Sequence, residues 1–123
     1  MLEIWVDDER PKPEEYADEA KSVHEALILT GMIIERQFQF KRSIFPFPND
    51  QKLLLDLDHD AGEYVTDGGD YINILKALSQ PWFGEMCGEL GSKILVRFHS
   101  ANPVGVQNMR EIVEKCKWLE EVK

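Results

Sequence analysis

Short apolar runs are separated by polar and turn-forming segments along the 123 residues of this chain. The runs at 2–6, 53–55 and 94–96 are typical of buried strands, because a strand covered on both faces has few polar positions. A further short strand is expected within 16–21. Strands that alternate with helices predict an α/β domain with a short, mainly parallel sheet.

Helices are expected in three places. Ser22 and Glu25 have the spacing of a capping box, which predicts a helix that begins there and ends near Gly31. A second helix is expected over 70–79, where apolar residues recur at helical spacing. A third begins with Asn102 as its N-cap and continues to the C-terminus along a core-facing apolar stripe.

Other segments are expected to be extended or irregular. After Gly31 apolar and polar residues alternate over 34–41, which favours a half-buried strand over a helix. The segment 44–50 is rich in turn-forming residues. The glycine-containing segments 62–69 and 81–91 are expected to be loops.

Composition limits the classes of function. Hydrophobic residues make up 43% of the chain, and its length suits one domain that covers 1–123. The net charge of −9 argues against an extended DNA-binding groove, which needs clustered basic residues. No apolar run approaches the roughly 20 residues that span a bilayer, so no membrane partner is expected. Cys87 and Cys116 form no disulfide or metal motif, which favours a cytoplasmic location.

Acidic residues follow two of the predicted strands. Ligands of parallel sheets bind beyond the carboxyl ends of the strands, where Asp7, Asp8 and Asp58 are therefore expected to meet. Converging carboxylates repel one another unless a cation is present, and oxygen ligands suit Mg²⁺ or Mn²⁺. The alternative is that Asp7 and Asp8 cap the first turn and that Asp60 stabilises the following loop.

The same edge carries histidines and a helix N-terminus. His59 and His99 have the imidazole chemistry of general acids and bases, although each could instead be a hydrogen-bonded structural residue. Ser100 and Asn102 precede a predicted helix, whose free amides favour an anion such as phosphate. Plain N-capping by Asn102 is the alternative, and the two roles are compatible.

Phenylalanines are interleaved with basic residues within 34–47. Such a pattern could stack nucleic-acid bases and contact phosphates. Core packing or a homo-oligomer interface through 34–47 is the favoured interpretation.

Three blocks of the sequence resemble the signature blocks of the cyclic-phosphate processing receiver domains. This family consists of small phage and bacterial relatives of response-regulator receiver domains that are associated with RNA repair. The blocks are IWVDDERPKP at 4–13, LDHDAG at 57–62 and HSANPVG at 99–105. Ala61 stands where the family usually has leucine, and 32–50 looks like an insertion. As a further departure, the chain is expected to have one helix beyond Gly105 and to lack the fifth strand whose lysine completes the switch of a signalling receiver, which argues against conventional phosphorelay.

The resemblance implies a three-layer, receiver-like (flavodoxin-like) fold with Asp7, Asp8 and Asp58 as its acidic pocket. It further implies that a set of residues acts on or binds a phosphate, such as a 2′,3′-cyclic phosphate end of a nucleotide or RNA. This set is His59, Asp60, His99, Ser100 and Asn102. In a phage-encoded protein, the location would be the host cytoplasm.

Three functions are consistent with these features. The leading hypothesis is a metal-dependent phosphoesterase or phosphate-end binder that acts on nucleotides or RNA termini. A second hypothesis uses the similarity of 53–58 to the first motif of haloacid-dehalogenase-type phosphatases, with Asp56 as nucleophile and Asp58 as acid. The third is a non-enzymatic phage adaptor or nucleotide-binding protein.

Overall fold

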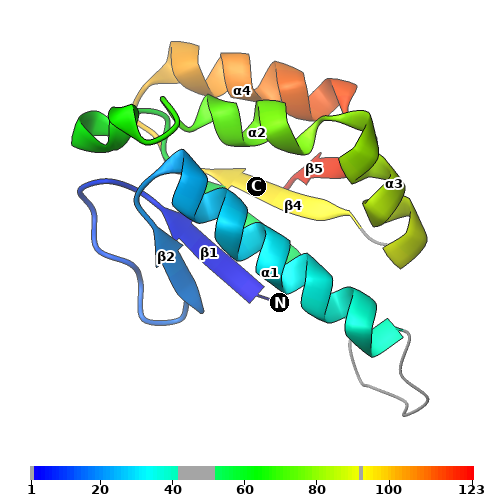
Figure 1. Cartoon of the computed structure of the whole chain (residues 1–123). Helices are drawn as coiled ribbons and strands as arrows, with labels where there is room; N and C mark the ends of the chain where they lie inside the picture. Colours follow the sequence, from blue (N-terminus) through cyan, green and yellow to red (C-terminus); the bar gives the residue numbers. More distant parts are fainter. Residues whose placement is uncertain (1, 42–51, 92) are drawn as a thin grey trace.

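A computed structural model describes residues 2–41, 52–91 and 93–123. Within these residues five parallel strands form one sheet in the order β2-β1-β3-β4-β5 (Figure 1). The strands are β1 (Leu2–Val6), β2 (Asp18–Ala20), β3 (Leu53–Leu57), β4 (Ile94–Phe98) and β5 (Leu119–Glu121). This strand order is that of the flavodoxin-like doubly wound fold. The predicted receiver-like α/β fold with a parallel sheet is therefore confirmed.

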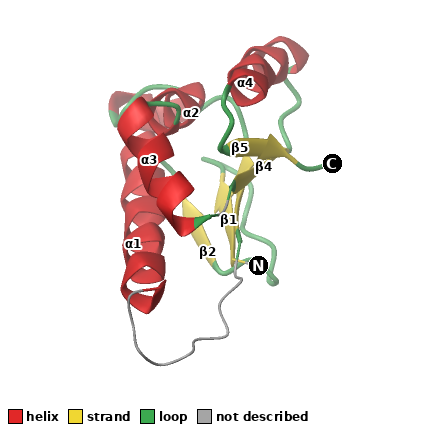
Figure 2. Cartoon of the chain, turned by 90° about the vertical axis from the view of Figure 1, so that its right-hand side faces the viewer, coloured by secondary structure: helices red, strands yellow, loops and turns green. Residues whose placement is uncertain are grey.

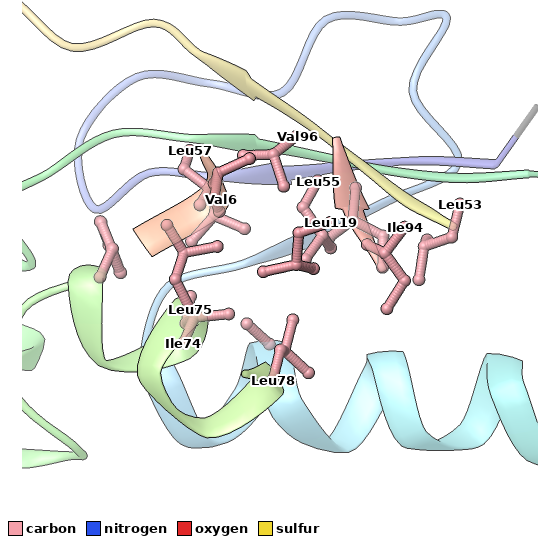
Figure 3. Close-up of a cluster of buried hydrophobic side chains, with 14 of the residues drawn as sticks. Val6, Leu53, Leu55, Leu57, Ile74, Leu75, Leu78, Ile94, Val96 and Leu119 are labelled. Atoms are coloured by element: carbon pink, nitrogen blue, oxygen red, sulfur yellow. The ribbon is translucent and has the colours of Figure 1, made fainter. Parts of the chain in front are cut away.

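The helices connect successive strands and pack on a shared apolar core. They are α1 (Val23–Lys41), the 3₁₀ helix η1 (Gly62–Thr66), α2 (Ile72–Leu78), α3 (Pro81–Leu90) and α4 (Pro103–Lys115). Each α-helix adds buried residues to one cluster with alternate residues of the strands. Figure 3 shows part of this cluster, in which Leu55 and Leu57 of β3 lie on the face of the sheet that Leu75 of α2 covers.

The first helix is longer than the sequence analysis predicted. It begins at Val23, after Ser22 has accepted the amide of Glu25 at 3.1 Å, as the capping box requires. It then continues through Gly31 to Lys41, so the predicted strand over 34–41 is wrong. Ala26, Thr30 and Ile34 are buried at helical spacing, and this packing outweighs the low helix propensity of Gly31.

Residues 32–41 of the expected insertion thus belong to α1, whereas the predicted loop at 44–50 lies outside the described residues. The structure likewise describes only part of the segment 34–47 that was expected to form an oligomer interface. Within the described residues no helix is both long and apolar enough to cross a membrane.

The segment 81–91 is helical, which corrects the prediction of a loop. Pro81 occupies the first turn of α3, and Gly91 ends it in the left-handed conformation at φ 71°. Proline at the start and glycine after the end are a helix signature that the sequence contains. Phe83 and Cys87 lie one turn apart on its buried face.

The C-terminal segment also differs from the prediction. Helix α4 ends at Lys115, and the chain turns extended at Cys116 to form β5, which pairs with β4. The expectation that the chain lacks a fifth strand is therefore wrong. Only Leu119 of its three residues is buried, so the apolar pattern is too short to mark a strand.

The face of the sheet opposite the helices, called the second face below, carries polar and aromatic side chains. Its side chains include Trp5, Asp56 and Arg97, which lie side by side on β1, β3 and β4. Tyr16, from the segment that joins β1 to β2, contacts all three of them. Figure 2 shows α1 and α3 together on the other side of the sheet.

Candidate functional site

The site is built where three neighbouring strands end. Asp7 follows β1, Asp58 follows β3, and His99 follows β4. The amide of Asp58 donates to Val6 at 2.9 Å, and that of His99 donates to Leu57 at 3.0 Å. These bonds extend the sheet register by one residue and hold the three backbones side by side, at the reversal of strand order where flavodoxin-like folds bind ligands.

Asp7, Asp58 and His99 form a candidate metal group. One ligand atom from each lies within 4.8 Å of the others. Asp7 is buried, with 2% of its surface exposed, whereas Asp58 and His99 are half-buried. Two carboxylates and one imidazole are a donor set that Mn²⁺ accepts, while Mg²⁺ favours oxygen ligands alone.

Asp7 has a structural role as well. Its Oδ1 accepts the amides of Glu9 and Arg10, both at 2.8 Å, so the expected capping of the first turn is present. Its Oδ2 lies 2.9 Å from Nε2 of His99. Burial raises the pKa of Asp7, but the two amides and His99 outweigh burial, and the net pKa is lowered.

His99 is held on both sides by carboxylates. Its Nδ1 lies 2.7 Å from Oδ1 of Asp56, opposite the contact of Nε2 with Asp7. The ring stacks on Trp5 with a centroid distance of 3.8 Å and an interplanar angle of 7°. Arg10 donates to the backbone carbonyl of His99 at 2.9 Å. These contacts fix both the plane and the position of the imidazole.

Asp56 belongs to this network, although the sequence analysis gave it a role only as the nucleophile of the second hypothesis. It is 2% exposed, its Oδ2 accepts the hydroxyl of Tyr16 at 2.5 Å, and Arg97 lies 3.7 Å away. The signal in the sequence was an aspartate inside an otherwise apolar strand, since a buried carboxylate needs partners. Because both its oxygens are occupied and buried, the geometry does not favour Asp56 as a nucleophile.

Asp8 was expected among the metal ligands but lies outside the group within the described residues. Its side chain turns toward Gly62, where an added Cβ would collide with Oδ2 of Asp8. Gly62 has a φ of 57°, which also favours glycine. Burial raises the pKa of Asp8, and the nearby carboxylates of Glu9, Asp7 and Asp58 raise it further. Asp8 therefore adds negative charge beside the group rather than a third carboxylate ligand.

His59 and Asp60 form a separate pair. Nδ1 of His59 lies 2.6 Å from Oδ1 of Asp60, whose side chain is 65% exposed. The His59 ring packs against Gly105 of α4 so closely that a Cβ there would overlap it. Asp70, whose Oδ1 accepts the amide of Ala61 at 3.0 Å, completes a second set of potential ligand atoms within 4.8 Å.

The start of α4 lies beside His59. Asn102 is the N-cap, as predicted, because its Oδ1 accepts the amide of Gly105 at 2.9 Å. Its Nδ2 lies 3.4 Å from Nδ1 of His59. Ser100 accepts the amide of Asn102 at 3.0 Å. With its oxygen used by the cap, Asn102 has only its NH₂ group to offer to a phosphate.

The site thus has two parts, and His99, which was expected with the phosphate-binding residues, lies in the acidic part. Asp7, Asp58 and His99 form an acidic pocket that can hold a cation. His59, Asp60 and the start of α4 form a neighbouring part that can move a proton and receive an anion. The predicted roles of these residues remain predictions, but their convergence from separate segments is observed.

Comparison with known proteins agrees with the resemblance. A family model for the cyclic-phosphate processing receiver domain matches residues 2–115. No curated protein and no solved structure matches the chain. The matched region contains β1, β3, β4 and all residues of both parts of the site. The chain belongs to the cyclic-phosphate processing receiver domain family.

Proposed function

We propose that this protein is a metal-assisted phosphoesterase that opens 2′,3′-cyclic phosphate ends of nucleotides or RNA. The observation that carries the proposal is the group of Asp7, Asp58 and His99, whose ligand atoms lie within 4.8 Å of one another. The family description supports the cyclic-phosphate substrate. The donor set supports Mn²⁺ ahead of Mg²⁺ as the ion.

The ion would be held by Asp7, Asp58 and His99. When bound, it would polarise a phosphoryl oxygen and offset the charge of the carboxylates. Asp8 contributes negative charge at the same place, which strengthens the electrostatic attraction for a cation. Without a cation, the carboxylates at this edge of the sheet would repel a dianionic phosphate product.

The reaction itself requires two proton transfers. Water adds to phosphorus, the bond from phosphorus to one ribose oxygen breaks, and a phosphomonoester with a free hydroxyl results. One proton leaves the water, and one reaches the departing oxygen. His59 is the better placed of the two histidines for this role, because Asp60 engages Nδ1 and Nε2 has no carboxylate partner among the described contacts.

The start of α4 would receive the phosphate. The positive end of the helix dipole, the Asn102 NH₂ group and the Ser100 hydroxyl are donors suited to an anion. Val104, which is 71% exposed, lies in the first turn of the same helix. An exposed apolar residue there offers a surface for a ribose or base.

The test is hydrolysis of a 2′,3′-cyclic nucleotide by the full chain in the presence of Mn²⁺, followed by chromatography after a chelator quench. Asp58→Asn should lower kcat/KM at least about 100-fold, since even indirect partners of a metal cost about 10- to 100-fold. Asp18→Asn, which neutralises an exposed aspartate of β2, is the matched control and should retain activity.

Two results would contradict the proposal. Tight nucleotide binding without any product would favour a nucleotide-binding protein instead. Equal activity of wild type and Asp58→Asn would place the reaction elsewhere.

A further inference from the structure

Asp56 is a buried carboxylate that the proposed reaction does not use. It is the second-last residue of β3, the central strand of the sheet, and 2% of its surface is exposed. Burying a carboxylate is costly unless hydrogen bonds or opposite charge compensate for it. Its partners should therefore indicate what the residue does.

The partners of Asp56 divide between its two oxygens. Oδ1 faces Nδ1 of His99 at 2.7 Å, while Oδ2 accepts the Tyr16 hydroxyl at 2.5 Å. Arg97 donates to that hydroxyl at 3.2 Å and lies 3.7 Å from Oδ2. The carboxylate is thereby fixed from the second face of the sheet, and only one of its oxygens is directed at the site.

We infer that Asp56 is a positioning residue that keeps a proton on Nδ1 of His99 and fixes the ring, so that Nε2 is directed at Asp7 and Asp58. An ionised carboxylate only accepts hydrogen bonds, so the nitrogen that faces it must carry the proton. Nε2 faces the carboxylate of Asp7 in the same way at 2.9 Å, so a metal bound there would take the place of the proton on Nε2. The inference rests on the proposed function only for the metal, not for the tautomer.

Two aromatic side chains also help to hold the His99 ring in place. Trp5 stacks on the His99 ring at 3.8 Å and meets Tyr16 edge-on at 5.4 Å. A tilt of the ring would therefore lose the stack, and a 180° flip would lose the contact of Nδ1 with Asp56. Outer-shell carboxylates of this kind set the tautomer and orientation of metal-binding histidines.

The test reads the His99 tautomer directly. Long-range ¹H–¹⁵N NMR of the metal-free chain, at a pH above the ordinary range of imidazole protonation, distinguishes protonated Nδ1 from protonated Nε2. Wild type should show a proton on Nδ1, whether or not the ring also carries one on Nε2 against Asp7. In Asp56→Asn the amide can present either its oxygen or its NH₂ group to the ring, so the Nδ1–H population should fall. His59 in the same spectra is an internal control and should not change.

A metal titration gives the second readout. Asp56→Asn should weaken Mn²⁺ binding by about 10- to 100-fold, the range for such partners. Tyr16→Phe leaves the Asp56 carboxylate in place and should weaken binding by a smaller factor. Asp18→Asn should bind as wild type does. Tyr16→Phe also keeps the inference testable if Asp56→Asn does not fold.

The outcomes separate this inference from the proposed function. An unchanged tautomer and unchanged Mn²⁺ affinity in Asp56→Asn would overturn it, and lost turnover in that same variant would indicate a nucleophile instead. A changed tautomer in a protein that hydrolyses no cyclic phosphate would support the inference while the proposed reaction fails.

Discussion

The two faces of the sheet are formed by the same strands but have different roles. On the helix-covered face, alternate residues such as Val6, Leu55 and Leu57 are fully buried and purely apolar. On the second face, Trp5, Asp56 and Arg97 occupy the neighbouring positions and contact one another through Tyr16 and His99. The helix-covered face, the first face, buries apolar surface in the core. The second face positions polar groups at the site.

This difference determines how specific each face must be. Apolar packing has no direction, so side chains of similar volume can replace one another at modest cost. Hydrogen bonds to a buried carboxylate do have direction, and losing one partner leaves the other unsatisfied. We therefore expect changes on the first face to affect stability, and changes on the second face to affect the site first.

The largest effect on stability should come from the helix-covered face. Leu55→Ala removes a side chain with no exposed surface and should lower the free energy of unfolding by about 2–5 kcal/mol. Urea denaturation followed by circular dichroism measures the change. Activity per folded molecule should remain close to wild type, because Leu55 points away from the site. A loss below about 1 kcal/mol would contradict the assignment of Leu55 to the core.

Substitution of a glycine in α3 should have the next largest effect on stability, and a second glycine of the same helix provides the control. A Cβ at Gly84 would overlap the Trp118 ring, which is fixed by its bond to the carbonyl of Leu78. Gly84→Ala should therefore cost about 1–3 kcal/mol of stability. Gly88→Ala meets nothing within 4 Å and should instead stabilise the protein by about 0.5–1 kcal/mol. If both variants melt alike, α3 does not pack on Trp118 as described.

How far the sequence alone predicted these faces can now be judged. The strands β1, β3 and β4 were predicted because their apolar runs are long enough to show a pattern. Helix α1 was cut short at Gly31 because a local stop signal is weak against the burial of Ile34, which only the folded chain reveals. In β5 the pattern was too short to detect.

The site was predicted better than its internal contacts. Placing aspartates after strands needs only the rule that parallel strands end together, so Asp7 and Asp58 met His99 as expected. The separation of Asp8 from that group depends on which way its side chain turns, and the sequence does not encode this locally. Asp56 and Tyr16 are 40 residues apart, and their bond depends on the path of the chain across the second face.

The dependence of stability on pH in the acid range should test the role of Asp7 at the site. The pKa of Asp7 is lowered in the folded protein, so its contribution is present above the unfolded value of 3.8 and is lost as the pH falls below it. Asp7→Asn should therefore be less stable than wild type near neutral pH, and the gap should narrow in acid. Denaturation series at several pH values measure this. A gap that stays constant with pH would show that the Asp7 charge is not stabilised as described.

The smallest effect should have the opposite sign. The pKa of Asp8 is raised, chiefly by burial and then by the carboxylates around it, so its ionised form is a cost to the folded state above 3.8 and the cost disappears as the pH falls. Asp8→Asn should thus raise the urea midpoint slightly at neutral pH without metal. Added Mn²⁺ should shrink or reverse this advantage, because a cation offsets the repulsion in wild type. A variant that is less stable than wild type in both conditions would mean that Asp8 is structural, and that the charge beside the acidic pocket is not kept for a ligand.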